Sequence, residues 1–343
     1  MKSHPRLTFA AFLSAVTICV FISLSGAHGQ DENSDATKST DAASATKPAG
    51  PENAPKPSDD SADASVPKKP SVVRRNEKSG ASAQVTLESA RDRLISYRSV
   101  QAEMVETVDL GMRRFRMKGS YLQGTDLKLR LEYDLLVGNT EAHLVEVCDG
   151  QRLWSHQTIG SEERVTSRDV RSILNAASAA GKTPQNLLTA ELGLGGLPGL
   201  LAGIQKSVQL EKQWEQDVNE QTFVAIEGGW KKTFREKFLG ENPDPKQPLP
   251  AFVPDQVRIY FEQKSLFPRR ILYLKHLEDG TRRPMVTLDF VDVRWDVELA
   301  EDAFDYTPPE KVARQDVTQA YINRFQPSKQ ETSSETQTEP SSN

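Results

Sequence analysis

The chain has 343 residues, of which 37% are hydrophobic and 27% charged, and its formal net charge is −5. A negative net charge disfavours a broad electrostatic surface for nucleic acid, so no nucleic-acid partner is expected. Of the two cysteines, Cys19 lies in the N-terminal apolar segment and only Cys148 lies in the remainder. The fold must therefore be held by its core and not by a disulfide.

The first residues have the pattern of a secretory signal. Two basic residues precede an apolar run over residues 7–24, and residues 27–29 follow the small-x-small pattern of a cleavage site. This predicts a signal peptide over residues 1–29, with an uncleaved anchor as the open alternative. We expect a chain that works in the periplasm or is otherwise secreted across the cytoplasmic membrane.

Composition divides the rest of the chain into three parts. Residues 30–84 are mostly Asp, Ser, Ala, Lys and Pro, and residues 327–343 are equally polar. Such segments cannot bury enough apolar surface to offset the entropy of ordering, which predicts a disordered spacer and a disordered tail. The remaining part, residues 85–326, is long enough for one domain with a sizeable core.

The predicted elements of this domain follow a simple order. Apolar residues at helical spacing over residues 85–100 indicate an amphipathic opening helix. Strand-like alternation follows over residues 100–110, 112–122, 127–137, 143–148, 151–156, 208–214, 222–228, 256–263, 269–277 and 285–299, and a helical pair is inserted over residues 167–206. The sequence thus predicts an α+β fold: a strongly curved antiparallel half-barrel of roughly ten strands, with an opening helix and an inserted helical lid.

One strand shows which face is apolar. In residues 127–137, Leu129, Leu131 and Tyr133 point to one side, while Lys128 and Arg130 point to the other. One face of the sheet is therefore predicted to be apolar and the opposite face solvated.

The next hairpin can be read in register. Asp149-Gly150 has the composition of a two-residue turn, which would set Val145 opposite Trp154 and His143 opposite His156. Opposed Cβ atoms lie about 5 Å apart, so the two imidazoles could hold a metal ion. A third ligand would have to come from elsewhere, so we expect a structural or surface pair of histidines, with a metal site as the open alternative.

The most unusual segment is residues 187–204, LLTAELGLGGLPGLLAGI. It is almost uncharged, but its glycines make it a poor continuous helix. Two interpretations stay open: a buried cover packed on the sheet, or a mobile flap over a cavity. In either case we expect the segment to lie over the apolar face of the sheet.

Catalytic motifs are not evident. Residues 177–183, ASAAGKT, end like a phosphate-binding loop, but alanine occupies position 176 where that loop needs glycine. The sequence has no nucleophile elbow and no zinc-protease motif, and Cys148 has no evident activating partner. We therefore expect no enzyme and no cofactor. Residues 230–254 look like an insertion, within which WKKTFREKF is expected to form a half-buried helix.

Several segments resemble, in their order, the LolA-like periplasmic lipoprotein-carrier superfamily. They are the opening helix, Gly119 followed by KLRLEYD, then VCDGQRLWSH, and finally AEDAFDYTPPEKV after the closing strand. The resemblance implies a curved antiparallel sheet around an apolar cavity covered by helices. It also implies that Phe304 plugs the edge of the core and that Pro308-Pro309 stops further strand pairing.

The predicted function follows from that resemblance: non-enzymatic binding or carriage of a lipid or lipoprotein acyl chain by a monomer. Burial of each acyl CH₂ contributes about 0.8 kcal/mol, so no catalytic constellation is needed. The alternative is an envelope sensor or interaction module that regulates a protein partner. The expected lining of the cavity is Leu129, Leu131, Tyr133, Val145, Trp154, Leu192, Leu197, Leu200 and Leu201.

Overall fold

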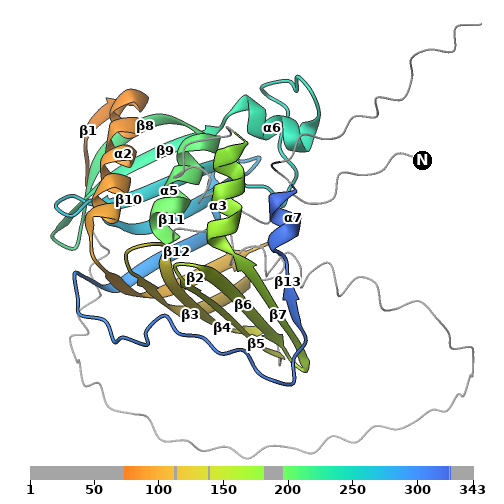
Figure 1. Ribbon diagram of the computed structural model, residues 1–343. Helices are drawn as coiled ribbons and strands as arrows, with labels where there is room; N and C mark the ends of the chain where they lie inside the picture. The colour runs from red at the N-terminus through yellow and green to blue at the C-terminus, as the bar shows by residue number, and fades with distance from the viewer. Residues whose placement is uncertain (1–72, 112–113, 138–139, 181–195, 324, 326–343) are drawn as a thin grey trace, which may run out of the picture.

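The computed structural model describes residues 73–111, 114–137, 140–180, 196–323 and 325 (Figure 1). The predicted signal peptide, the predicted spacer as far as residue 72 and the tail from residue 327 lie outside the described residues. The fold itself begins before Val85, because residues 73–84 form a strand and the start of a helix. The side chains of residues 74–79 are exposed and polar, so composition alone gave no sign of that strand.

The described strands form one 13-stranded sheet in the order β1-β8-β9-β10-β11-β12-β2-β3-β4-β5-β6-β7-β13. They are β1 (Val73–Ser79), β2 (Val100–Asp109), β3 (Arg114–Gln123), β4 (Lys128–Val137), β5 (Thr140–Asp149), β6 (Arg152–Ile159), β7 (Glu162–Asp169), β8 (Val208–Val218), β9 (Gln221–Trp230), β10 (Gln256–Glu262), β11 (Pro268–His276), β12 (Arg282–Trp295) and β13 (Arg314–Asp316). Only β13 pairs in parallel, with β7. The predicted α+β class and the ten expected strands are confirmed, and β1, β7 and β13 are additional.

Helices cover one side of this sheet (Figure 1). The described helices are α2 (Gly80–Ser96), α3 (Val170–Ala179), α5 (Gly196–Ser207), α6 (Lys232–Leu239) and α7 (Thr318–Ile322). Helix α2 starts at Gly80, where a Cβ atom would lie 2.2 Å from the carbonyl oxygen of Leu210, so only glycine lets the helix approach β8 this closely. None of the described helices has the length and apolar character needed to cross a membrane.

The face under α2, α3 and α5, hereafter the inner face, carries the main core. Alternate residues of β2, such as Val100, Ala102 and Met104, are buried there, together with Leu129 and Tyr133 of β4. Buried residues of the three helices complete the same cluster, which includes Leu87 and Leu94 of α2, Ile173 and Leu174 of α3, and Leu197, Leu201 and Ile204 of α5. The alternation predicted for β4 is confirmed.

The opposite face, hereafter the outer face, is crossed by the C-terminal segment of residues 296–313. Phe304 of this segment is buried against the β3–β4 turn, with the Lys128 ammonium 5.9 Å from its ring centroid. After Pro308-Pro309 the chain continues into β13, which pairs with β7. The double proline therefore does not end strand pairing, and that expectation is wrong.

Candidate functional site: an apolar groove and a buried carboxyl on the inner face

The β5–β6 hairpin has a different register from the predicted one. Cys148 pairs with Leu153, Val147 with Trp154, and Val145 with His156. The connection is longer than two residues, because the Asp149 carboxylate accepts hydrogen bonds from the backbone N–H groups of both Gln151 and Arg152, each at 2.7 Å. This side-chain turn holds four residues between the last pair, which moves every partner by two positions.

The register separates the two histidines. His143 lies opposite Thr158, and its Nδ1 is 2.6 Å from Asp134 Oδ1. His156 Nε2 is 2.7 Å from Glu163 Oε1. Each imidazole thus has its own carboxylate, and the predicted opposed pair is wrong. Among the described residues, no group of three or more His, Cys, Asp or Glu side chains could hold a metal ion.

Val145 and Trp154 belong to the outer face and not to the predicted cavity lining. The ring of Trp154 lies 6.2 Å from that of Tyr306 in the C-terminal segment, and the Tyr306 hydroxyl lies 2.7 Å from His156 Nδ1. The prediction failed because both faces of β5 are buried, so the apolar pattern did not identify which side faces the helices.

The other predicted lining residues that the structure describes do share the inner-face core. Leu129, Tyr133, Leu197 and Leu201 are buried there, and Leu131 and Leu200 are partly buried against them. The N–H of Leu197 donates a 2.9 Å hydrogen bond to the hydroxyl of Tyr121, which fixes the start of α5 to β3. Leu192 lies outside the described residues.

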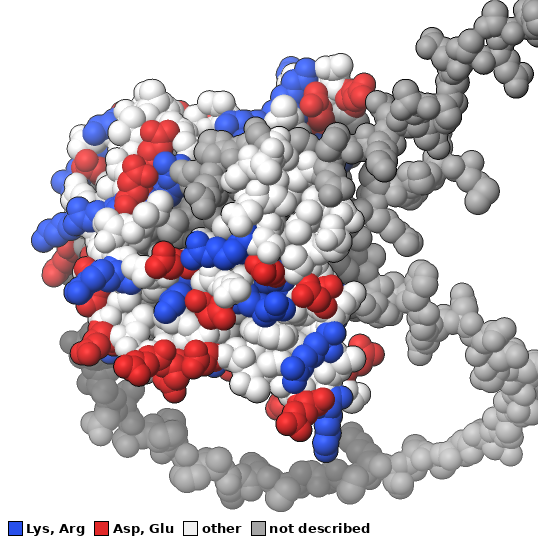
Figure 2. All heavy atoms as spheres, viewed as in Figure 1, with Lys and Arg blue, Asp and Glu red and all other residues white. Residues whose placement is uncertain are grey.

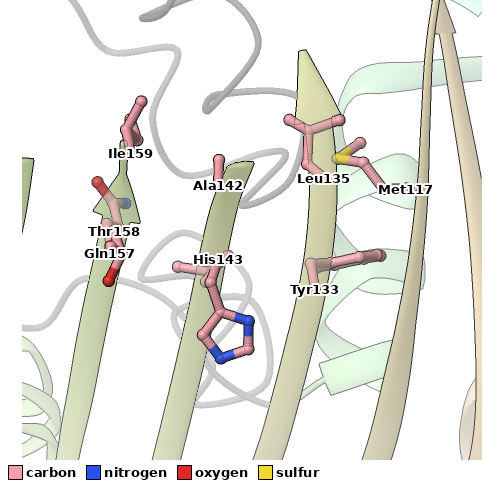
Figure 3. Close-up of a pocket in the computed structure, with 9 residues that line it drawn as sticks. Met117, Tyr133, Leu135, Ala142, His143, Gln157, Thr158 and Ile159 are labelled. Atoms are coloured by element: carbon pink, nitrogen blue, oxygen red, sulfur yellow. The ribbon is translucent and has the colours of Figure 1, made fainter. Parts of the chain in front are cut away.

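A narrow groove opens on the inner face at the end of strands β3 to β6 (Figure 3). Its apolar lining residues are Met117, Tyr133, Leu135, Ala142, Leu144 and Ile159. Figure 3 shows the labelled residues on neighbouring strands, with Leu135 and Met117 close together. The groove encloses about 10 Å³, which is room for roughly one water molecule. An acyl chain can enter only if the surrounding side chains or helices move.

A carboxyl group lies beside this groove. Glu106 of β2 is 2% exposed and projects from the inner face, where it pairs across the sheet with Met117 of the groove. The hydroxyl of Tyr133 donates a 3.7 Å hydrogen bond to Met104 Sδ, and it lies close enough to the Glu106 carboxyl to lower the pKa of that group slightly by hydrogen bonding. Glu106 Oε1 has no hydrogen-bond partner among the described residues.

Gly119 allows Tyr133 to reach that far. A Cβ atom at this position would lie 2.8 Å from the Tyr133 ring. The ring therefore extends from β4 across β3 to β2 only because position 119 has no side chain. This gives a local structural reason for the glycine that contributed to the family resemblance.

Two further polar side chains share this face. Tyr273 of β11 is 3% exposed, and its hydroxyl has no hydrogen-bond partner among the described residues. Glu146 of β5 is 7% exposed and acts electrostatically on Tyr133. Burial raises the pKa of Glu106 to about 8, against which the Tyr133 hydrogen bond acts weakly. Burial and the nearby Glu106 also raise the pKa of Tyr273. At neutral pH the Glu106 carboxyl is therefore mostly protonated.

Glu106 and Glu146 were not predicted as site residues, although each is an ionisable residue in the buried phase of its strand. In β2 the buried phase runs Val100, Ala102, Met104, Glu106 and Val108, so the glutamate occupies a position that alternation assigns to the core. Ionisable residues in the apolar phase of a strand are the informative exceptions to the pattern.

A second pocket lies beside α6 and the proline-rich loop after it. It encloses about 800 Å³. Its lining includes Trp230, Lys232, Arg235, Gln256 and His276. Gln256 is 8% exposed and its Oε1 has no partner among the described residues. The half-buried helix predicted for WKKTFREKF is confirmed, with Phe234 as its buried residue.

Comparison with known proteins gives structural likeness only. No family model and no curated protein matches the sequence. Solved structures that the chain resembles include LprF from Mycobacterium bovis (10% identity, TM-score 0.34, covering 64% of this chain and 95% of that one) and lipoprotein LppX from Mycobacterium tuberculosis (11%, 0.33, 64% and 98%). A LolA superfamily protein from Nitrosomonas europaea is a third (10%, 0.27, 65% and 97%). Because these TM-scores are below 0.5, the function is inferred from the chain's own residues.

Proposed function

We propose that this chain binds a lipid or lipoprotein acyl chain on the inner face of its sheet, outside the cytoplasm and without catalysis. The observation that carries the proposal is the apolar groove at the end of β3 to β6, which opens at the rim of the sheet and leads along Met117 and Tyr133. Contact with an acyl chain removes apolar surface from water on both partners, which stabilises the complex without specific polar chemistry.

The lining of the open site follows from the inner-face residues. Leu129, Leu131 and Tyr133 of β4 form its floor, and Leu197, Leu200 and Leu201 of α5 form its cover. In the closed structure these side chains pack against one another, so binding exchanges protein contacts for ligand contacts. The described helices α3 and α5 would move away from the sheet as a chain enters.

The surface is compatible with this role. Lys and Arg side chains are interspersed with Asp and Glu over the face seen in Figure 2, and neither sign dominates it. Such a surface does not favour a polyanion, and it leaves the apolar inner face as the more selective feature of the molecule.

A pair of variants on neighbouring residues of β5 tests the proposal. Ala142 lines the groove on the inner face, whereas Glu141 is exposed on the outer face. Ala142→Phe should fill the groove and weaken displacement of the uncharged dye N-phenyl-1-naphthylamine by C12 lipids about tenfold or more, and Glu141→Phe should leave it unchanged. Lipid extraction and mass spectrometry of the purified protein supply an independent readout. Equal effects of the two variants, or a wild-type protein that takes up no acyl compound, would contradict the proposal.

A second candidate function, a sensor or interaction module that regulates a protein partner, is favoured by the pocket beside α6. Its volume and its mixed polar lining suit a protein side chain or loop better than an acyl chain. Lys232→Glu together with Arg235→Glu should then abolish capture of a partner while leaving uptake of the dye intact. Loss of both activities would contradict two separate sites.

A further inference from the structure

We propose that Glu106 and Tyr273 form a polar subsite on the inner face that accepts the carbonyl oxygen of an acyl ester or amide. This inference rests on the proposed function, since it names the polar group that accompanies the acyl chain. Both side chains project from the inner face, Glu106 from β2 and Tyr273 from β11, with β12 between them.

Glu106 and Tyr273 both have hydrogen-bonding capacity that the described residues do not use. Buried polar atoms in folded proteins nearly always have a partner, and each exception needs an explanation. Here Glu106 Oε1 and the Tyr273 hydroxyl both lack one among the described residues, although the two side chains are only 2% and 3% exposed. An unsatisfied group at such a depth destabilises the fold unless something else completes it.

The missing partner of these two groups must be a hydrogen-bond acceptor. The neutral acid of Glu106 carries a proton, and Oε1 is the oxygen without a partner among the described residues, so its O–H is available to donate. The Tyr273 hydroxyl also has a proton to donate. Two donors on one apolar face suit an acceptor with two lone pairs, and a carbonyl oxygen is such an acceptor.

A charged head group does not suit the surroundings of Glu106. Glu146 lies on the same inner face, and none of the described ion pairs includes Glu106. A carboxylate or phosphate buried there would lie on the same face as Glu146, and the described ion pairs offer it no cation beside Glu106, which is unfavourable. The neutral linkages of acyl lipids, the ester and the amide, meet the requirement.

An acyl chain can reach Glu106 from the groove. Met117 and Tyr133 line the groove; Met117 is the cross-strand neighbour of Glu106, and Tyr133 lies close enough to influence its pKa. A chain that enters at the rim therefore meets Glu106 after passing these two residues. Its apolar tail remains in the groove while its carbonyl reaches the polar groups.

The test compares two probes of equal length, methyl dodecanoate and the carbonyl-free dodecyl methyl ether, in displacing N-phenyl-1-naphthylamine from the purified protein. Wild type should bind the ester about tenfold more tightly than the ether. Tyr273→Phe should reduce this ratio to about twofold, and Glu106→Leu should do the same. Glu106→Gln keeps a donor and should retain the preference. Tyr260→Phe, which changes a tyrosine on the outer face, is the matched control.

The outcomes separate the two proposals. If neither probe displaces the dye, the acyl-binding function fails and this inference fails with it. If both probes bind equally, or if Tyr273→Phe leaves the ratio unchanged, the subsite is wrong while acyl binding stands. Tighter binding of dodecanoate or dodecylammonium than of the ester would also overturn the subsite. Monododecanoylglycerol and an uncharged N-dodecanoyl dipeptide amide then identify the source of the carbonyl, and preference for either one upholds the proposal.

Discussion

The two faces of the sheet each bury a glutamate, and the two carboxyl groups have opposite surroundings. Glu227 on the outer face is fully buried and contacts three cationic side chains: Arg258 by hydrogen bonds, Arg282 at 2.9 Å and Lys212 at 3.4 Å. Burial alone would raise the pKa of Glu227, but these cations outweigh it and lower the pKa. Glu106 on the inner face has no ion pair among the described residues, and burial raises its pKa to about 8.

The difference shows that burial alone does not decide what a carboxyl does. Glu227 is a charged partner in a network that joins β8, β9, β10 and β12. Glu106 is a neutral acid beside a groove, where a leucine of similar size would pack without an unsatisfied atom. The first arrangement contributes to the fold, whereas the second leaves Glu106 Oε1 without a hydrogen-bond partner among the described residues.

The largest effect expected from this comparison is on the outer face. Glu227→Gln should lower the free energy of unfolding by about 3 to 5 kcal/mol, because it leaves the buried charge of Arg258 and its neighbours uncompensated. Urea denaturation at pH 7 measures this. A variant as stable as wild type would mean that the outer network is not held by Glu227.

Substitution of Glu106 on the inner face should instead raise the free energy of unfolding, by an amount that depends on pH. A folded-state pKa above the unfolded value means that stability is complete at low pH and is lost as pH rises from about 4.5 to about 8. Glu106→Gln removes this loss, so the variant should gain stability over wild type by about 1.4 kcal/mol per pH unit in that range. Tyr133, Glu146 and Tyr273 share the face and are present in both proteins. A difference that does not change with pH would contradict the assignment.

Much of the fold could be predicted from alternation and turn composition. Ten strands, the opening helix and the helical insertion follow from residues that alternate between water and core, as in β4. The three missed strands lack this signal. The residues of β13 are all exposed, and β7 begins with three exposed residues before Val165 and Ser167 are buried, so the alternation in these strands is absent or short.

The site was less accessible to sequence reasoning. One side-chain turn at Asp149 moved the hairpin register by two residues, and the C-terminal segment that covers Trp154 comes from residues more than a hundred positions away. The inner-face residues of β4 and α5 were predicted correctly because each of these two segments has a continuous apolar pattern in the sequence. Glu106 was missed because Tyr133 and Tyr273, the polar residues that share its face, come from segments far away in the sequence.

A smaller effect should separate the faces further. The Tyr306 hydroxyl connects the C-terminal segment to His156 on the outer face, and Tyr306→Phe should lower the free energy of unfolding by about 1 kcal/mol. It should leave the affinity for methyl dodecanoate unchanged, because the interactions that the described residues show for Tyr306 and His156 are with outer-face side chains such as Trp154 and Glu163. A weaker affinity in the folded variant would show that the C-terminal segment influences the ligand site.

The last prediction concerns the rate at which Cys148 is chemically modified and not the stability of the fold. This rate measures how tightly the inner face is closed. Cys148 is 1% exposed beneath the helices, and burial raises the pKa of its thiol to about 11. At pH 8 only about 0.1% of it is thiolate, against about a quarter for an unperturbed cysteine, so iodoacetamide should modify it at least about a hundredfold more slowly. A Cys19→Ser background leaves Cys148 as the sole thiol. In a Cys19→Ser, Cys148→Ser protein, Glu141→Cys on the exposed outer face of the same strand provides the reference rate. If Cys148 reacts within about tenfold of that reference, the inner face opens readily without a ligand, and its buried acid is less isolated from water than Glu227 on the other side.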